Sequence, residues 1–277
     1  GKRATAMDTS PENILPSAHA AASLVGRIWN PDAAGPSLVC VRDGAILDIT
    51  STAAPTMRDL LEMDDPAAFV RSRPGASLGE VEEIAANSVA HRGDATRPHM
   101  LAPFDLQAVK ACGVTFAQSI IERVIEEMAK GDASQADAIR ARCIDILGSS
   151  LTSVKAGSEE AEGVKQALIE AGMWSQYLEV GIGPDAEVFT KAQPMSSVGW
   201  GADVGLHPVS EWNNPEPEIV LAVNSLGAVK GATLGNDVNL RDVEGRSALL
   251  LGKAKDNNAS SAIGPFIRLF DNGYGID

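Results

Sequence analysis

Two acidic side chains separated by one residue open a short apolar run and could bind a metal ion together. Glu216 and Glu218 begin the run EPEIVLAV, residues 216–223. In a β-strand, residues two apart project to the same face, so these two carboxylates would lie side by side. Adjacent carboxylates repel each other, and a hard divalent cation such as Mg²⁺ relieves that repulsion. The alternative is an edge strand with two solvated acids, which Pro217 also fits.

A third carboxylate and a lysine follow closely in the sequence. Asp237 lies in GNDVNLRD, residues 235–242, one short strand and one turn after Glu218, and could return across the sheet. Lys253 follows in LGKAKD, residues 251–256. Three carboxylates and a lysine suit metal-assisted enolate chemistry, in which the metal polarises a 2-keto acid and the amine moves a proton. Taken singly, a turn aspartate and a lysine are more often solvated surface groups.

The composition excludes several other classes of function. The chain has 277 residues and a formal net charge of −14. Because an acidic chain repels phosphate backbones and anionic lipid heads, we expect neither nucleic acid nor membrane partners. Its three scattered cysteines lack metal-binding spacing and indicate a reducing, cytoplasmic compartment. Residues 181–186 match the loose dinucleotide pattern G-x-G-x-x-A, but the sequence after them predicts a strand where the motif requires a helix.

The elements that would position these side chains divide into two segments. Residues 1–100 are predicted to form a small α/β domain, with a hairpin that turns at Asp43-Gly44. Residues 101–277 form the second segment, which begins with three amphipathic helices that end near Gly131, Gly148 and Gly172. Short β-type runs then follow and make the rest of this segment mostly sheet, at residues 188–190, 218–223, 228–233 and 263–269.

The motifs taken together resemble the fumarylacetoacetate hydrolase superfamily. Its pattern is E-x-E, then N-D-x-x-x-R-D, then a G-K or A-K lysine, then G-P. The matching segments here are Glu216-Pro217-Glu218, residues 235–242, Gly252-Lys253 and Gly264-Pro265. The longer match, from Leu101 through NNPEPE (213–218) and KAKDNN (253–258), is similar to the bacterial 2-keto-3-deoxy-pentonate (xylonate or arabinonate) dehydratases of that superfamily.

This resemblance implies an α+β fold with a mixed β-sandwich roll of the fumarylacetoacetate hydrolase type over residues 101–277. It implies Mg²⁺, with Mn²⁺ as an alternative, on Glu216, Glu218 and Asp237. Lys253 matches the lysine beside the metal, and Lys191 matches a strand lysine that faces the active site. Family members are usually homodimers or homotetramers. They also continue past the G-P segment into further strands and a carboxylate-anchoring loop, so we expect the roll to be incomplete here.

One departure from the family pattern bears on the reaction. Hydrolase members often carry G-x-N-Y-x-x-H-x-x-E, whose histidine and glutamate activate water, whereas Ser119 stands at the histidine position here. Serine is a poor general base, which favours loss of water over hydrolysis of a carbon–carbon bond. The resemblance therefore implies a hydro-lyase that converts a 2-keto-3-deoxy-pentonate to 2,5-dioxopentanoate in pentose catabolism. Lys253 or Lys191 would remove the carbon 3 proton, Glu122 or a water would assist the leaving hydroxyl, and Thr115 and Ser119 would orient hydroxyls.

Two other functions remain open on the same residues. The first is a hydrolase or decarboxylase that acts on a diketo acid, of the acylpyruvate or fumarylacetoacetate type, with the same metal. The second is a binding protein that keeps the scaffold without catalysis. Release of pyruvate from an acylpyruvate would favour the first. Heat stabilisation by a keto acid, without Mg²⁺ and without turnover, would favour the second.

Overall fold

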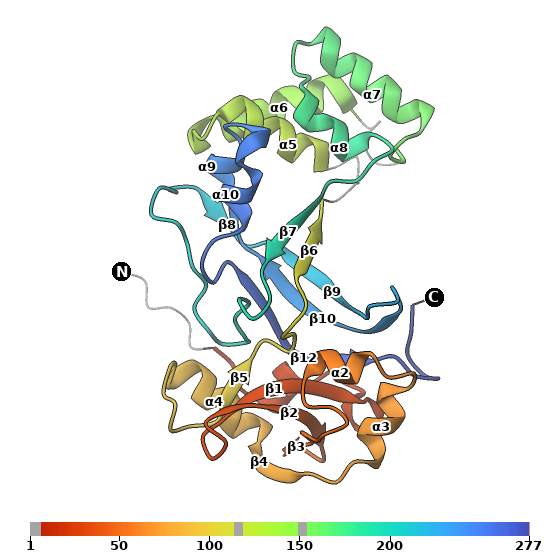
Figure 1. Cartoon of the computed structure of the whole chain (residues 1–277). Helices are drawn as coiled ribbons and strands as arrows, with labels where there is room; N and C mark the ends of the chain where they lie inside the picture. The colour runs from red at the N-terminus through yellow and green to blue at the C-terminus, as the bar shows by residue number, and fades with distance from the viewer. Residues whose placement is uncertain (1–6, 114–118, 149–153, 277) are drawn as a thin grey trace.

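The computed structural model describes residues 7–113, 119–148 and 154–276 of the chain. Figure 1 shows a large sheet with short helices around it at one end of the molecule and a layer of longer helices at the other. Two strands, β6 (Val109–Cys112) and β7 (Val188–Ala192), pair with each other and run between these two parts (Figure 1). The α+β class expected from the sequence is confirmed.

The main sheet has eight antiparallel strands within the described residues. Their order is β4-β3-β2-β1-β12-β10-β9, and β5 also pairs with β1. The bounds are β1 (Leu24–Asn30), β2 (Gly35–Arg42), β3 (Ala45–Asp48), β4 (Ala76–Glu80), β5 (His99–Leu101), β9 (Pro217–Val223), β10 (Val229–Asp237) and β12 (Ser261–Leu269). The strand runs predicted near residues 218–223, 228–233 and 263–269 are therefore confirmed.

The hairpin between β2 and β3 turns where the sequence predicts. Asp43 and Gly44 form the turn with φ values of 51° and 81°, and Arg42 pairs with Ala45 across it. A two-residue turn with positive φ at both positions matches the twist of antiparallel strands, and glycine adopts that conformation without a steric penalty. The hairpin thereby fixes the register of β2 against β3.

Alternate residues of β2 face two separate hydrophobic cores. Leu38 and Cys40 pack with the buried residues of α2 (Met57–Leu61) and α3 (Pro66–Ser72). Val39 packs on the opposite face with the buried residues of α4 (Val81–Ala90). Burial of side chains on both faces is the main source of stability in this part of the molecule. The remaining short helices at this end are α1 (Pro11–Ile14) and η1 (His19–Ala21).

Strand β12 joins the N-terminal strands to the strands that carry the acidic residues. On one side Leu24 pairs with Arg268 of β12, and on the other side Asp237 pairs with Ser261. The main sheet thus contains strands from both sides of the boundary expected near residue 100. The division into domains of 1–100 and 101–277 stays a prediction.

Within the described residues, the helical layer consists of the three predicted helices, one short helix and two 3-10 turns. The helices are α5 (Ser119–Ala129), α6 (Ala136–Leu147), α7 (Glu159–Glu170) and α8 (Glu179–Ile182), with 3-10 turns η2 (Ala133–Gln135) and η4 (Gln176–Leu178). Ser158 caps α7, because its Oγ accepts a hydrogen bond from the backbone N–H of Ala161. Apolar residues at helical spacing on α5, α6 and α7 form one buried cluster.

Several short elements, one before β9 and the others after β10, lie between the main sheet and the helical layer (Figure 1). They are β8 (Asn213–Asn214), which pairs with β11 (Asn239–Leu240), then α9 (Arg241–Glu244), η5 (Ala248–Leu250) and α10 (Leu251–Lys255). Helix α9 packs against α5, and α10 packs against β7. In the described part of the chain, no helix is both long enough and apolar enough to cross a lipid bilayer.

Candidate metal centre

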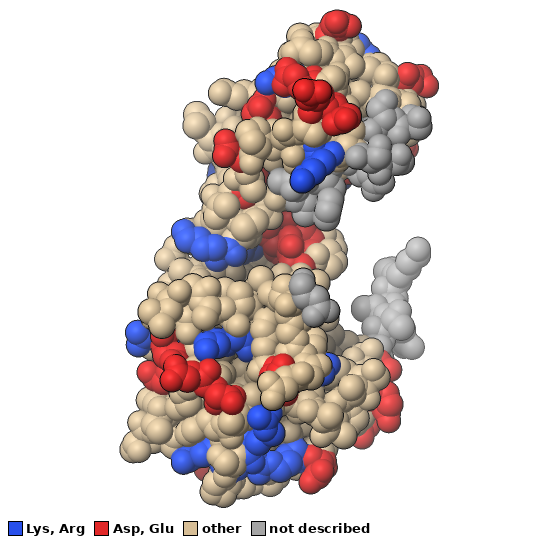
Figure 2. Space-filling model, turned by 90° about the vertical axis from the view of Figure 1, so that its right-hand side faces the viewer, with Lys and Arg blue, Asp and Glu red and all other residues tan. Residues whose placement is uncertain are grey.

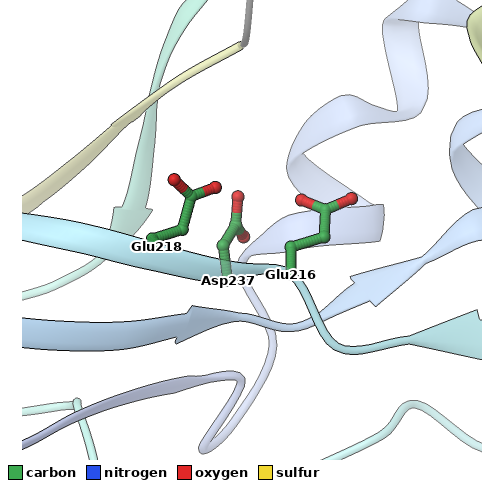
Figure 3. A group of neighbouring side chains, drawn as sticks. All are labelled: Glu216, Glu218 and Asp237. Carbon is green, nitrogen blue, oxygen red and sulfur yellow. The ribbon is translucent and has the colours of Figure 1, made fainter. Parts of the chain in front are cut away.

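Three carboxylates converge where β9 and β10 lie side by side. Glu216 directly precedes β9, Glu218 lies within it, and Asp237 ends β10. The pairing of Gly235 with Glu218, and a hydrogen bond of 2.9 Å from the Asp237 backbone N–H to the Glu216 carbonyl, set this register. Figure 3 shows all three side chains projecting to the same side of the two strands. The convergence predicted from the alternation of strand residues is therefore present.

The geometry of these carboxylates fits a divalent cation. One carboxylate oxygen from each of Glu216, Glu218 and Asp237 lies within 4.8 Å of the other two. Mg²⁺ and Mn²⁺ prefer oxygen ligands, and Mg²⁺ binds them at about 2.0–2.1 Å, so oxygens around one ion lie within about 4 Å of one another. Small side-chain rotations would bring the three oxygens to that spacing. The donor set thus suits Mg²⁺ or Mn²⁺ and is unlike a nitrogen- and sulfur-based zinc site.

The electrostatics of the site also favour a cation. Burial, followed by repulsion from Asp237, raises the pKa of Glu218, which lies on β9. Burial is likewise the main reason that the pKa of Glu216 is raised, with Asp237 and Glu244 adding repulsion against the opposing effect of Lys255. A bound dication would stabilise the ionised form of each carboxylate.

Lys191 on β7 is fixed by three acceptors. Its Nζ donates to Val238 O at 2.7 Å and to Lys255 O at 2.5 Å, and lies 2.8 Å from Asp237 Oδ1. The side chain is 2% exposed, and burial lowers its pKa despite the carboxylate of Asp237. Two hydrogen bonds and one ion pair therefore hold the Lys191 side chain against Asp237.

Lys255 on α10 contacts two of the three carboxylates. Its Nζ lies 2.5 Å from Glu216 Oε2 and 3.2 Å from Asp237 Oδ2, and the residue is 3% exposed. Burial alone would lower the pKa of Lys255, but the charges of Glu216, Glu244 and Asp237 outweigh burial and raise it above its usual range. The ammonium and the carboxylates therefore stabilise each other in the charged state.

The structure corrects the position of the lysine beside the metal ligands. Lys253 is exposed, and its backbone carbonyl accepts a hydrogen bond from Asn257 Nδ2 at 2.9 Å. Lys255, two residues later, is the lysine that reaches Glu216 and Asp237. The family pattern allows a G-K or an A-K lysine, and Ala254-Lys255 fits it as well as Gly252-Lys253 does. That second match was the available signal for Lys255.

The residues expected to assist the leaving hydroxyl or to orient hydroxyls differ in their surroundings. Glu122 on α5 forms ion pairs with two arginines: its Oε1 lies 2.6 Å from Arg140 Nη2, and its Oε2 lies 2.6 Å from Arg241 Nη2. Burial would raise the pKa of Glu122, but hydrogen bonds from both arginines outweigh it and lower the pKa. Ser119 is the first residue of α5 and is half-buried. Thr115 lies outside the described residues.

A buried acidic pair beside the centre was not foreseen from the sequence. Glu126 on α5 and Glu244 on α9 both lie within hydrogen-bond distance of the Tyr177 hydroxyl. Arg241 contacts Glu126 through Nε at 3.0 Å and also stacks on the Trp212 ring. These residues come from four separate segments, so no local spacing in the sequence could have grouped them.

A cavity of about 450 Å³ opens beside the carboxylates. Its polar wall includes Lys191, Glu218, Asp237 and Lys110, whose Nζ donates to Thr190 Oγ1 at 2.6 Å. The rest of its wall is mostly apolar and includes Phe104, Val109, Val220, Leu221 and Ile263. The space-filling view shows the molecule narrowing between the main sheet and the helical layer, with acidic atoms in the hollow (Figure 2). A small acid could reach the metal centre through this cavity.

The mixed α+β architecture with antiparallel sheets is consistent with a fold of the fumarylacetoacetate hydrolase type. A solved structure with the same fold is "2-keto-3-deoxy-D-arabinonate dehydratase complexed with magnesium and 2,5-dioxopentanoate". It aligns with a TM-score of 0.55 and 19% identity over 89% of this chain and 66% of that chain. At that identity the likeness establishes the fold alone.

Two proteins are similar to this chain in sequence. A Haloferax volcanii protein named "Probable 2-keto-3-deoxyxylonate dehydratase" is 28% identical over 232 residues, which cover 83% of this chain and 63% of that protein. The "2-dehydro-3-deoxy-D-arabinonate dehydratase" of Saccharolobus solfataricus is 37% identical over 94 residues, or 33% of this chain and 32% of that protein. No family model matches the chain. The resemblance to 2-keto-3-deoxy-pentonate dehydratases is confirmed, although the chain spans less than two thirds of these relatives.

Proposed function

We propose that this chain is a metal-dependent hydro-lyase that removes water from a 2-keto-3-deoxy-pentonate and forms 2,5-dioxopentanoate. The observation that carries this proposal is the convergence of Glu216, Glu218 and Asp237 within 4.8 Å, with two buried lysines on them. The names of the relatives support the same substrate class. The similar solved structure contains magnesium and 2,5-dioxopentanoate.

Glu216, Glu218 and Asp237 would hold Mg²⁺ or Mn²⁺. When bound, the metal supplies Lewis-acid polarisation of the carbonyl next to carbon 3, which makes the carbon 3 proton more acidic. The protein keeps the three carboxylates pointed at one centre: the β9–β10 register fixes Glu218, and Lys191 fixes Asp237. Preorganisation of this kind spares the protein rearrangement during the reaction.

The proton at carbon 3 would pass to Lys255 in place of Lys253. Lys255 is the buried amine beside the carboxylates, whereas Lys253 is exposed. Because Lys255 is an ammonium paired with Glu216 and Asp237, it must first lose a proton before it can accept another. Lys191 donates two hydrogen bonds to backbone carbonyls and forms an ion pair with Asp237, so it would have the positioning role instead.

The wider setting of the reaction is part of the same proposal. The substrate and product belong to pentose catabolism without phosphorylated intermediates, which takes place in the cytoplasm. A homodimer or homotetramer is expected for the assembled enzyme. Size-exclusion chromatography with light scattering measures the oligomeric state directly, and a monomer at working concentration would remove that part of the proposal.

The test is turnover of 2-keto-3-deoxy-xylonate and 2-keto-3-deoxy-arabinonate with and without Mg²⁺. We expect 2,5-dioxopentanoate to appear only with metal, and Glu218→Gln to abolish it, because Gln leaves a neutral oxygen where a carboxylate is needed. The matched control is Glu170→Gln at an exposed position of α7, which should retain full activity. Full Mg²⁺-dependent activity of Glu218→Gln would refute the site.

The apolar wall of the cavity favours a second candidate function, which is cleavage or decarboxylation of a diketo acid. Phe104, Val109 and Leu221 suit a hydrocarbon chain better than the hydroxyl groups of a pentonate. Ser119 at the histidine position opposes this candidate, since serine cannot activate water as histidine does. Incubation with acylpyruvates separates the two functions: release of pyruvate identifies the diketo-acid enzyme, and its absence beside pentonate dehydration excludes it.

A further inference from the structure

Two buried carboxyl groups, those of Glu126 and Glu244, both contact the hydroxyl group of Tyr177. This arrangement offers too few hydrogens for both carboxyl groups to be ionised. The Tyr177 hydroxyl oxygen lies 2.9 Å from Glu126 Oε2 and 3.0 Å from Glu244 Oε1. Glu126 is 9% exposed and Glu244 is 7% exposed. A tyrosine hydroxyl has one hydrogen, so it can donate to only one of the two carboxylates. The second close contact is favourable only if the other carboxyl group carries a proton and donates it to the tyrosine oxygen.

The surrounding cations do not neutralise the pair. Arg241 Nε lies 3.0 Å from Glu126 Oε1, but the same guanidinium also contacts Glu122 at 2.6 Å. Within the described residues, Glu244 forms an ion pair with neither lysine nor arginine, and its hydrogen bond is with Tyr177. The other groups that face Glu126 are the Tyr177 hydroxyl and the acids Glu244 and Glu216. Lys255 also interacts by charge with Glu244, and Arg123 lies 5.4 Å from the centre of the Tyr177 ring. Lys255 forms its ion pairs with Glu216 and Asp237, however, and Arg123 forms its ion pair with Glu187. Within the described residues Arg241 is thus the one cation paired with Glu126 or Glu244, which leaves an excess of negative charge in a dry environment.

The charges around Glu126 favour a retained proton. Burial first, and then repulsion from Glu244, raises the pKa of Glu126 to about 7, against the opposing effect of Arg241. The neighbouring Glu122 differs, since two arginines keep its pKa low. Glu126 therefore keeps its proton to a higher pH than Glu122 on the same helix. This contrast separates a group that exchanges a proton near neutral pH from one that stays ionised.

The pair also lies within electrostatic reach of the metal centre. The charge of Glu216 contributes to the environment of Glu126, and Glu244 contributes to the environments of both Glu216 and Lys255. Helix α9, which carries Glu244, begins four residues after Asp237, with the short strand β11 between them. A proton held by the pair is thus next to the groups that would exchange protons with the substrate.

We propose that Glu126 and Glu244 share one proton across the Tyr177 hydroxyl at neutral pH and are the proton store of the metal centre. The two glutamates are positioning residues, because they act through Glu216 and Lys255. Their part in catalysis rests on the proposed function, whereas the shared proton does not. In each turnover Lys255 would pass one proton toward the pair and then take the proton from carbon 3. The pair would return the extra proton to the departing hydroxyl, so it ends with the one proton that it held at the start.

Infrared difference spectroscopy over a pH titration tests the shared proton without substrate or turnover. We expect the carbonyl band of a buried, protonated carboxylic acid at pH 6, and its loss as the pH rises through about 7. Glu126→Gln should remove this titrating band. Glu159→Gln, at an exposed position of α7, should leave it unchanged. A spectrum of the unmodified protein without such a band at pH 6, or a band that survives in Glu126→Gln, would overturn the proposal.

Tyr177→Phe provides a second variant in case Glu126→Gln does not fold. Without the bridging hydroxyl the two carboxyl groups lose their common hydrogen-bond partner, so the band should shift and titrate at a different pH. An unaltered band in Tyr177→Phe contradicts the bridge. The kcat profile against pH adds a functional readout: its limb near pH 7 should move in Tyr177→Phe. If the band titrates as expected but no pentonate turns over, the proposed function fails and the shared proton stands.

Discussion

The Lys191 ammonium nitrogen lies 2.8 Å from Asp237 Oδ1, and both residues are buried. This contact joins β7 to the end of β10, two strands that belong to different sheets. Because Lys191 also donates to the carbonyls of Val238 and Lys255, one side chain connects the strand that carries the proposed metal ligand Asp237 with the helix that carries the second lysine. The geometry of the candidate metal centre therefore depends on the packing of three elements.

Replacing Lys191 by Met should destabilise the protein as well as the site. The substitution removes one of the two cations beside the buried Asp237 carboxylate and the donor to two backbone carbonyls, and breaking a buried pair from one side costs about 3–5 kcal/mol. Urea unfolding followed by circular dichroism measures the free energy of unfolding. Lys230→Met, at a half-buried surface position of β10, is the control and should change it by less than about 1 kcal/mol. Equal stabilities of the Lys191 variant and the unmodified chain would contradict this role.

The two lysines of α10 should respond in opposite ways to substitution. Lys255→Met removes the cation beside Glu216 and Asp237, so we expect the rate of pentonate dehydration to fall by at least about 100-fold. This is the lower end of the rate effect that general acid–base groups contribute. Lys253→Met alters an exposed side chain and should leave kcat and KM unchanged. Steady-state kinetics on both variants decides between them. A large loss in Lys253→Met with an active Lys255→Met would restore the assignment made from the sequence.

Binding of Mg²⁺ should weaken on acidification at a higher pH than ordinary glutamates would allow. Burial raises the pKa of both Glu216 and Glu218, and a protonated carboxyl group binds the cation poorly. The apparent affinity should therefore fall as the pH drops toward these raised values, before it reaches the usual glutamate range near 4.5. Isothermal titration calorimetry at several pH values measures the effect. An affinity that stays constant down to pH 5 would be the opposite result.

Glu126 should make the protein less stable as the pH rises toward neutrality. Its pKa is about 7 when folded against 4.5 for the unperturbed group, so between these values the folded state binds more protons than the unfolded state. The free energy of unfolding then falls between about pH 4.5 and about pH 7, and the loss is complete above pH 7. The total loss is up to about 3 kcal/mol, at 1.36 kcal/mol per pKa unit.

The comparison of Glu126→Gln with the unmodified chain isolates this effect, because glutamine does not titrate. The difference in unfolding free energy between the two proteins, measured in urea at pH 5 and pH 8, should shift in favour of the variant at the higher pH. Glu159→Gln provides the control for loss of one exposed charge. A difference that does not change with pH would show that Glu126 is ionised throughout.

The carboxylates of the centre were predictable because their arrangement is local. Strand alternation places Glu216 beside Glu218, and a single hairpin returns Asp237 to them. Lys255 was harder to find, because α10 has only five residues and a pattern that short does not reveal which of two lysines faces inward. The sequence match allowed both lysines, and only the packing of α10 against β7 separates them.

Long-range packing accounts for the features that the sequence did not indicate. Glu126, Tyr177 and Glu244 meet through the docking of α9 on α5, which no spacing along the chain encodes. The apolar run of 263–269 predicts a strand, but not its insertion between β1 and β10. Strand order in antiparallel sheets depends on which apolar faces match across the whole domain, and local propensity carries little information about it.

The central place of β12 also has a consequence for how the polypeptide acquires its structure. Strand β1 has its neighbour β2 only a few residues away, but its other main partner is made from residues 261–269. A nascent chain that has emerged only as far as β10 can form the hairpins on either side but cannot unite them. Assembly of the sheet must therefore wait for a late-synthesised segment, which predicts slow, high-contact-order folding and a vulnerable interval on the ribosome.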